Sequence, residues 1–338
     1  MIKQSSRTIV HTFGHPPAVV SLEPAPATVP RAGLVRVRMR LAAVNPSDLV
    51  TIAGTYSSRT QLPFVPGFEG VGIVDAVGPE VEDLRPGDRV LPIGSAGAWA
   101  DAKLAAAPWC FQVPQALSDE AAATSYVNPL TALLMLHDRI RVSPGMTIAI
   151  NAAGSAIGRM LVRLAAAAGA HPIAVVRSAR TLPLLAGEPI AQAIVLADDE
   201  APDVLVRRVH DQLGHAHLDA VLDAVGGGAG EALLDAVASG GRFIHYGLLS
   251  GRALPPDLPR RRPDVAIELF WLRQWVHAQP RALVADRLRE AWQLVEAGVL
   301  ATKIEARYPL DRAPEALRHA LSAGRDGKIL LEMGVVGG

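Results

Sequence analysis

Cysteine is nearly absent from this sequence, since Cys110 is the single one among 338 residues. One thiol excludes a disulfide framework within the chain, and it excludes a structural zinc site built from four cysteines. An excess of either charge is also missing, because Lys plus Arg and Asp plus Glu both number 33. The sequence therefore gives no indication of a nucleic-acid or membrane-surface partner.

Long hydrophobic runs are missing as well. No apolar stretch is long enough to span a bilayer, and residues 1–7 lack the apolar segment of a signal peptide. We therefore expect a cytoplasmic protein. Half of the residues are nevertheless hydrophobic, so a large core can form. Because 338 residues exceed one usual domain, two domains are the natural expectation.

The middle of the chain predicts a strand, a turn, a helix and a second strand. Residues 146–151 form a short apolar run rich in β-branched side chains, which is typical of a buried parallel strand. A turn of small residues follows at 152–158. Residues 157–168 are almost entirely apolar and predict a helix, and residues 171–176 predict the second strand.

The turn between the first strand and the helix is a candidate phosphate site. A helix N-terminus presents free N–H groups, and small side chains let a pyrophosphate approach the backbone. With Gly158 as the third glycine of G-x-G-x-x-G, the first two positions hold Ala153 and Ser155, so one glycine of three is present. A tightly packed corner without a ligand is the alternative. The candidate contacts of the turn are Ala153, Gly154, Ser155, Ala156, Ile157 and Gly158.

The end of the second strand indicates which dinucleotide the turn would bind. NAD-binding folds place an acidic residue there to hold the ribose hydroxyls, and this chain has Arg177, Ser178 and Arg180 instead. Guanidinium groups suit a 2′-phosphate, to which they make paired charge-assisted hydrogen bonds. We therefore expect NADPH rather than NADH. The alternative is a solvated arginine at a strand end.

The chain divides into two parts that differ in their sequence pattern. Residues 8–123 are rich in turns and strands, and residues 35–41 alternate apolar side chains with Arg, the period of a half-buried strand. From about residue 124, strands alternate with helices, which predicts a doubly wound parallel sheet. The run 327–333 predicts a strand that rejoins the first domain. We expect a barrel-like domain at 1–124 and 273–338, and an α/β domain at 125–272.

Some shorter segments carry expectations of their own. Residues 230–238 and 280–297 predict helices. The basic run 260–262 is expected to be an exposed loop. His215 and His217 have no obvious third ligand, so they indicate a solvated loop and not a metal site.

Several motifs resemble those of the medium-chain dehydrogenase/reductase superfamily, and the resemblance covers essentially the whole chain. It implies a GroES-like catalytic domain, a Rossmann NADPH-binding domain and a homodimer. The motifs are Asn45-Pro46-Ser47-Asp48, Leu62-Pro63-Phe64-Val65-Pro66-Gly67-Phe68-Glu69-Gly70-Val71-Gly72, Pro86-Gly87-Asp88-Arg89-Val90, the glycine-poor turn, and Gly241-Arg242-Phe243.

Three further features resemble the 2-enoyl thioester reductases of mitochondrial type within the zinc-free branch. They are residues 127–132, the opening Asn151-Ala152, and residues 270–275. The resemblance implies reduction of the carbon–carbon double bond of an enoyl-CoA or enoyl-ACP by NADPH. It extends the implied coenzyme contacts to Asn128, Thr131, Tyr246, Gly247, Phe270, Trp271 and Lys328. Helix capping is the alternative for Asn128 and Thr131. The alternatives for Phe270 and Trp271 are the wall of an acyl pocket, plain core or a subunit contact.

The same resemblance argues against zinc. Asn45 stands where zinc-dependent relatives have a cysteine, and Phe68 stands where they have a histidine. Without a Lewis acid a carbonyl is not polarised by metal, so alcohol dehydrogenation is disfavoured. Reducing a conjugated double bond delocalises the developing charge and needs no metal.

Tyr56 matches the proton-donor tyrosine proposed for these relatives, and a phenol is protonated at neutral pH. Asn45 is the second candidate catalytic residue, because its amide could orient substrate or coenzyme. The alternatives are a Tyr56 that only lines the pocket and an Asn45 that only forms a turn, while Asp48 is expected to be structural. Two other functions stay open: an NADPH:quinone oxidoreductase and a non-catalytic NADPH-binding protein.

Overall fold

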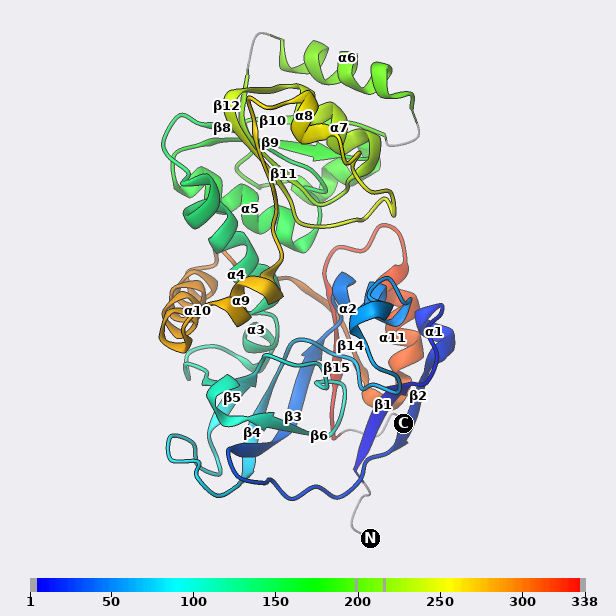
Figure 1. Ribbon diagram of the computed structural model, residues 1–338, viewed down its shortest axis with the longest axis vertical. Coiled ribbons are helices and arrows are strands. Elements are labelled where there is room, and N and C mark those ends of the chain that lie inside the picture. The colour runs from blue at the N-terminus through cyan, green and yellow to red at the C-terminus, as the bar shows by residue number, and fades with distance from the viewer. Residues whose placement is uncertain (1–4, 198–199, 215–216, 335–338) are drawn as a thin grey trace. The chain divides into compact units, whose positions relative to one another are not determined.

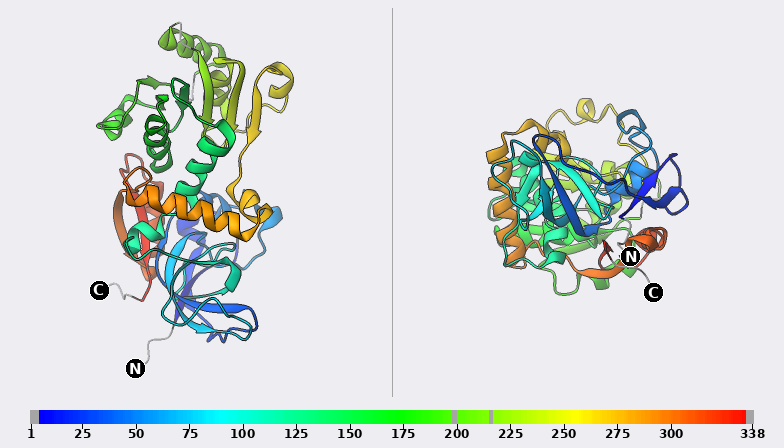
Figure 2. Two further views of the ribbon diagram at one scale, coloured as in Figure 1. Left: turned by 90° about the vertical axis from the view of Figure 1, so that its left-hand side faces the viewer. Right: turned by 90° about the horizontal axis from the view of Figure 1, so that it is seen from below.

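The computed structural model describes residues 5–197, 200–214 and 217–334 (Figures 1 and 2). His215 lies outside the described residues. The chain forms two compact units. Unit 1 is the chain up to Val127 together with the chain from Trp275 onward, and unit 2 is Asn128–Gln274. The boundaries expected from the sequence lie a few residues earlier at both points.

Unit 1 is built on a seven-stranded sheet in the order β14-β15-β3-β4-β5-β7, with β6 paired to β3. A separate antiparallel pair, β1 and β2, lies beside it. The strands are β1 Ser6–Val10, β2 Val20–Pro24, β3 Leu34–Ala43, β4 Gly70–Val77, β5 Arg89–Pro92, β6 Ala102–Ala106, β7 Cys110–Gln112, β14 Ile304–Pro309 and β15 Lys328–Glu332.

Strand β3 shows why this sheet forms. Val35, Val37 and Met39 are buried in the core, while Arg38 and Arg40 are exposed. This confirms the strand expected from the alternation over residues 35–41. Strand β15 pairs antiparallel with β3, which confirms that the end of the chain rejoins the first domain.

Unit 1 also contains helices, and most of them are short. In Figures 1 and 2, α10 lies beside the segment that follows α3, where Nε1 of Trp292 donates to Oγ of Ser125 at 2.9 Å. The helical segments are α1 Pro16–Val19, α2 Pro46–Ile52, Ser57–Arg59, Ala107–Trp109, α3 Asp119–Ala123, α10 Arg281–Glu296, Leu310–Arg312 and α11 Ala313–Leu321. α10 confirms the helix expected near the end of the chain.

Unit 2 contains a six-stranded sheet in the order β10-β9-β8-β11-β12-β13, and all of its pairings are parallel. This order is that of a doubly wound Rossmann sheet, whose topological switch point lies between β8 and β11. The strands are β8 Thr147–Ile150, β9 His171–Val176, β10 Gln192–Val195, β11 Leu218–Asp223, β12 Val237–His245 and β13 Ala266–Leu269.

The helices of unit 2 differ from expectation in two places. α7 ends at Asp235 and β12 begins at Val237, so the helix expected over 230–238 is wrong at its end. The run 260–262 is largely helical, since α8 covers Leu258–Arg261 with Pro259 in its first turn. The helical segments are α4 Val127–Leu133, Leu134–Ile140, α5 Ala156–Ala167, Ala179–Leu185, α6 Pro202–Leu213, α7 Gly227–Asp235, α8, and α9 Leu272–Ala278. The first residue of α4 and the last four residues of α9 belong to unit 1.

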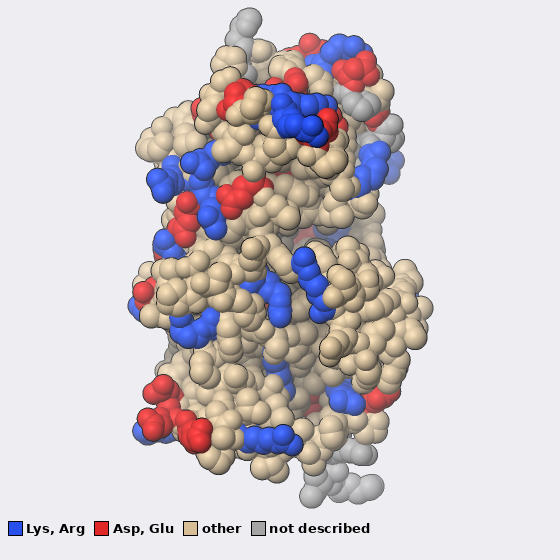
Figure 3. All heavy atoms as spheres, viewed as in Figure 1, with Lys and Arg blue, Asp and Glu red and all other residues tan. Residues whose placement is uncertain are grey.

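Charges on the surface are mixed in sign. Arg261 pairs with Glu231, and Arg262 with Asp264 at 2.9 Å. On the face shown in Figure 3, basic and acidic side chains adjoin one another in several places. No helix among the described residues has the length and apolar character needed to cross a membrane.

Candidate active site

Two local features fix the turn between β8 and α5, a capping hydrogen bond and a close approach of the backbone. Oγ of Ser155 accepts a hydrogen bond from the backbone N–H of Gly158 at 3.1 Å, which caps α5. A Cβ at residue 158 would lie 2.5 Å from the carbonyl oxygen of Ala152, so only glycine fits. The helix therefore begins directly against the end of β8, with its first N–H groups at the carboxyl edge of the sheet.

Residues 177–180, here called the arginine loop, follow β9, the neighbour of β8 in the sheet. Arg177 and Arg180 are both exposed, and Oγ of Ser178 accepts from the N–H of Arg180 at 3.3 Å. A Cβ on Gly154 would lie 2.5 Å from Cγ2 of Thr181, so the glycine turn and the arginine loop are in contact. The structure thus brings the two halves of the expected coenzyme motif together at one edge.

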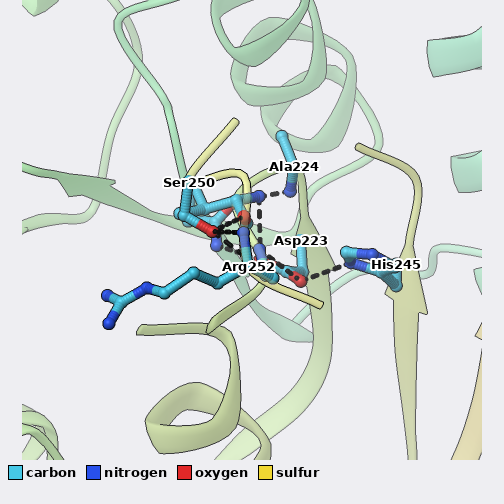
Figure 4. A network of polar contacts seen from close by, with 8 residues as sticks. Asp223, Ala224, His245, Ser250 and Arg252 are labelled. Carbon is cyan, nitrogen blue, oxygen red and sulfur yellow. Dashed lines mark hydrogen bonds and ion pairs between the residues drawn. The ribbon is translucent and has the colours of Figure 1, made fainter. Parts of the chain in front are cut away.

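Asp223, at the end of β11, is a functional candidate that sequence reasoning missed (Figure 4). Its side chain is fully buried, and Oδ1 accepts from Nδ2 of Asn151 and from the N–H groups of Val225 and Gly226. Oδ2 accepts from Nδ1 of His245 at 2.6 Å. Asn151 directly follows β8 and His245 ends β12, so one carboxylate connects the ends of three adjacent strands around the switch point.

Tyr246 and Gly247 follow His245 directly. The hydroxyl oxygen of Tyr246 is buried and has no hydrogen-bond partner among the described residues. Burial, and after it the charge of Asp223, raise the pKa of this phenol far above its ordinary value, so it is protonated. A Cβ on Gly247 would lie 2.8 Å from the carbonyl oxygen of Ala224, which requires glycine there. An unpartnered buried hydroxyl is a group that a bound ligand could satisfy.

The other expected coenzyme residues of unit 2 lie on α4 and after β13. Asn128 and Thr131 are largely buried and lie one turn apart on α4. Thr131 is interior to that helix, so it does not cap it. Phe270 is buried, its N–H donates to the carbonyl oxygen of His245 at 2.8 Å, and Trp271 follows it.

In unit 1, Asn45 directly precedes α2 and lies within a buried polar network. Its Nδ2 donates to Oε2 of Glu69 at 3.0 Å, and its Oδ1 accepts from Nζ of Lys328. The other oxygen of Glu69, Oε1, accepts from the N–H groups of Tyr126 and Val127 at 2.6 and 2.8 Å. Every side chain of this network is almost completely buried.

Asp48 completes the network and is buried in the first turn of α2. Its Oδ2 accepts from the N–H of Asn45 at 2.8 Å, and Oδ1 accepts from the N–H of Phe68 at 3.0 Å. Burial raises the pKa of Asp48 to about 7 and also raises the pKa of Glu69. Burial lowers the pKa of Lys328 to about 8. Nζ of Lys328, an expected coenzyme contact, thus lies on the Asn45 amide within this network.

Tyr56 follows α2, and its side chain is 36% exposed. Its carbonyl oxygen accepts from the N–H of Arg59 at 2.9 Å. The phenol belongs to the same unit as the Asn45 network, and it is open enough to reach a small molecule.

Two family models match the chain: alcohol dehydrogenase GroES-like domain at residues 31–115, and zinc-binding dehydrogenase at residues 191–331. The human mitochondrial enoyl-[acyl-carrier-protein] reductase is 30% identical over 98% of this chain and 90% of its own length. The Arabidopsis thaliana protein of the same name is 30% identical over 97% and 88%.

Solved structures of the same fold are also similar. A putative NADPH:quinone reductase from Bacillus thuringiensis superposes with a TM-score of 0.89 at 31% identity, over 98% of this chain and 99% of that one. A mycobacterial protein in complex with NADPH has a TM-score of 0.85 at 26% identity, over 97% and 99%.

Although one matching model carries zinc in its name, the residues around Asn45 do not fit a zinc ion. The Lys328 ammonium already contacts Asn45, and a second cation beside it would be repelled. Phe68, whose N–H donates to Asp48, has no side-chain atom that could ligate a metal ion. Nowhere in the described part of the chain are three or more His, Cys, Asp or Glu side chains grouped to hold a metal ion.

Proposed function

Because the chain belongs to the medium-chain dehydrogenase/reductase superfamily, we propose that it is an oxidoreductase that uses NADPH to reduce the carbon–carbon double bond of a 2-enoyl thioester. The observation that carries this proposal is the 30% identity to mitochondrial enoyl-[acyl-carrier-protein] reductases over nearly the full length of both chains. Unit 2 would bind the coenzyme and unit 1 would carry the catalytic groups.

Unit 2 has the features that NADPH requires. The capped, glycine-crowded start of α5 offers N–H groups to a pyrophosphate, and Arg177 and Arg180 stand beside it for a 2′-phosphate. Ser178, Tyr246 and Gly247 line the same edge, and Asn128, Thr131, Phe270 and Trp271 complete the proposed coenzyme contacts. When bound, NADPH would supply the hydride.

Tyr56 is the proposed proton donor in unit 1. The carbon next to the thioester carbonyl needs a proton after the double bond has accepted a hydride, and a phenol can provide it or hydrogen-bond the enolate oxygen. Asn45 would orient the substrate or the coenzyme with the Nδ2–H that Glu69 does not use. Lys328 would fix the Asn45 amide through one N–H of its ammonium. Its remaining N–H groups would make the expected contact with the coenzyme.

A substrate comparison tests the reaction. The rate of NADPH oxidation should be measured with crotonyl-CoA and with a simple quinone, at equal enzyme concentration. We expect the thioester to have the higher kcat/KM. A quinone rate far above the thioester rate would overturn the proposal.

A quinone oxidoreductase is the second candidate, and the 31% identical Bacillus thuringiensis structure favours it. A third candidate is a non-catalytic NADPH-binding protein, which tight NADPH binding without turnover of any enone, quinone or thioester would indicate. We further propose a homodimer located in the cytoplasm. Light scattering on the purified protein tests the dimer, and cell fractionation tests the location.

A further inference from the structure

His245 is held by Asp223 in a way that leaves one ring nitrogen for a ligand. The contact between Nδ1 and Oδ2 is 2.6 Å, and the imidazole is 15% exposed while the carboxylate is fully buried. A carboxylate only accepts hydrogen bonds, so Nδ1 carries the proton. In the neutral ring Nε2 is then an acceptor of fixed direction.

Asp223 itself has no freedom to move. Beyond His245, it accepts from Asn151 and from two successive N–H groups of the β11–α7 turn. Asn151 in turn accepts from the N–H of Ala224 at 2.7 Å. A Cβ on Gly230 would lie 2.9 Å from Oδ2, so the helix behind the carboxylate also packs tightly. A ring held by such a group is oriented before any ligand arrives.

The place of His245 in the sheet indicates which part of a dinucleotide it meets. A doubly wound sheet consists of two mononucleotide-binding halves on either side of the switch point. Arg177 follows β9 in the half formed by β8, β9 and β10, where the adenosine 2′-phosphate would lie. His245 ends β12, in the half formed by β11, β12 and β13. The second half faces the nicotinamide nucleotide.

We propose that Nε2 of His245 accepts a hydrogen bond from a hydroxyl of the ribose on the nicotinamide side of the coenzyme, with Asp223 as the residue that positions the ring. This inference rests on the proposed NADPH-dependent function. It adds His245 as a polar contact, directly before Tyr246 and Gly247, which are two of the coenzyme contacts expected from the sequence.

The substitution His245→Asn tests this contact separately from the structural role of His245 as a partner of Asp223. The asparagine Nδ2–H can replace the Nδ1–H donor toward Asp223, while nothing replaces Nε2. NADPH binding should be titrated by fluorescence for the full-length wild type and the variant. The dissociation constants of NADPH and NADH should both rise about 3- to 10-fold, as for the loss of one hydrogen bond. The constant for 2′,5′-ADP, which lacks the nicotinamide riboside, should stay unchanged.

Each other outcome is decisive. If NADPH binds the wild type and His245→Asn with equal affinity, the contact does not exist. If the affinity for 2′,5′-ADP falls by the same factor as the affinity for NADPH, the substitution has disturbed the whole site, and Nε2 has no specific role. If the wild type binds neither NADPH nor 2′,5′-ADP, the proposed function itself fails, and this result is distinct from the first two.

Discussion

The ammonium of Lys328 donates a hydrogen bond to Oδ1 of Asn45, although 283 positions separate these residues in the sequence. The same amide donates to Glu69, so Asn45 bridges a buried cation and a buried carboxylate. Removing one charge of such a set leaves the other buried and uncompensated. The network therefore gives unit 1 stability that depends on charge.

Lys328→Met should lower the free energy of unfolding by about 3 to 5 kcal/mol, because Glu69 and Asp48 lose their buried counter-charge. Urea denaturation at pH 7 measures the change. Lys303→Met is the matched control, since Lys303 is mostly exposed and pairs with Asp326, and its change should stay below about 1 kcal/mol. Equal, small effects of both substitutions would contradict this account.

Asp48 should make stability depend on pH. Burial raises its pKa from 3.8 to about 7, so between these values the folded chain binds more protons at this carboxyl than the unfolded chain does. The free energy of unfolding should therefore fall as the pH rises through this window. Relative to Asp48→Asn, which cannot titrate, the wild type should lose about 2 kcal/mol or more between pH 4 and pH 7.

Denaturation of both proteins at several pH values measures this difference. The hydrogen bond lost in Asp48→Asn changes the free energy of unfolding by the same amount at every pH. The pH dependence of the difference between the two proteins therefore reports the titration of Asp48. A difference that stays the same from pH 4 to pH 7 would show that Asp48 is ionised throughout.

The fold of unit 2 was predictable from the sequence where one local pattern determined one element. The apolar run 157–168 and the small residue at 158 indicated α5 and its tight start, and the structure has Ala156–Ala167. The end of α7 was not predictable, because residues 232–238, which are apolar except for Asp235, suit a helix and a strand equally. Pairing of Leu218 with Val237 decides for the strand.

The polar networks were less accessible, because they join residues that are distant in the chain. Asp223 ends the largely apolar run 218–223, which by itself indicates only a strand. Its position as a strand's last residue, like that of Asn151 after β8, was the available signal, since the ends of parallel strands meet at one edge. The strand order that also brings in His245 comes from the structure alone.

Tyr56→Phe should lower kcat about 100-fold with an enoyl thioester and leave the dissociation constant of NADPH nearly unchanged, because the hydroxyl is needed only where the substrate accepts its proton. Steady-state kinetics and NADPH titration measure the two effects. Tyr308→Phe is the control, since that hydroxyl contacts Nδ1 of His319 at 3.0 Å within unit 1. Unchanged turnover in Tyr56→Phe would leave Tyr56 as a lining residue.

Arg177→Ala should weaken NADPH about 10- to 100-fold and NADH much less, because only NADPH carries the 2′-phosphate that an exposed guanidinium after β9 can bind. Parallel fluorescence titrations with both coenzymes give the ratio. Arg207→Ala on α6 is the control, since Arg207 is exposed and pairs with Asp203 one turn away, and it should change neither affinity. Equal losses for NADPH and NADH in Arg177→Ala would refute the proposal that this arginine binds the 2′-phosphate.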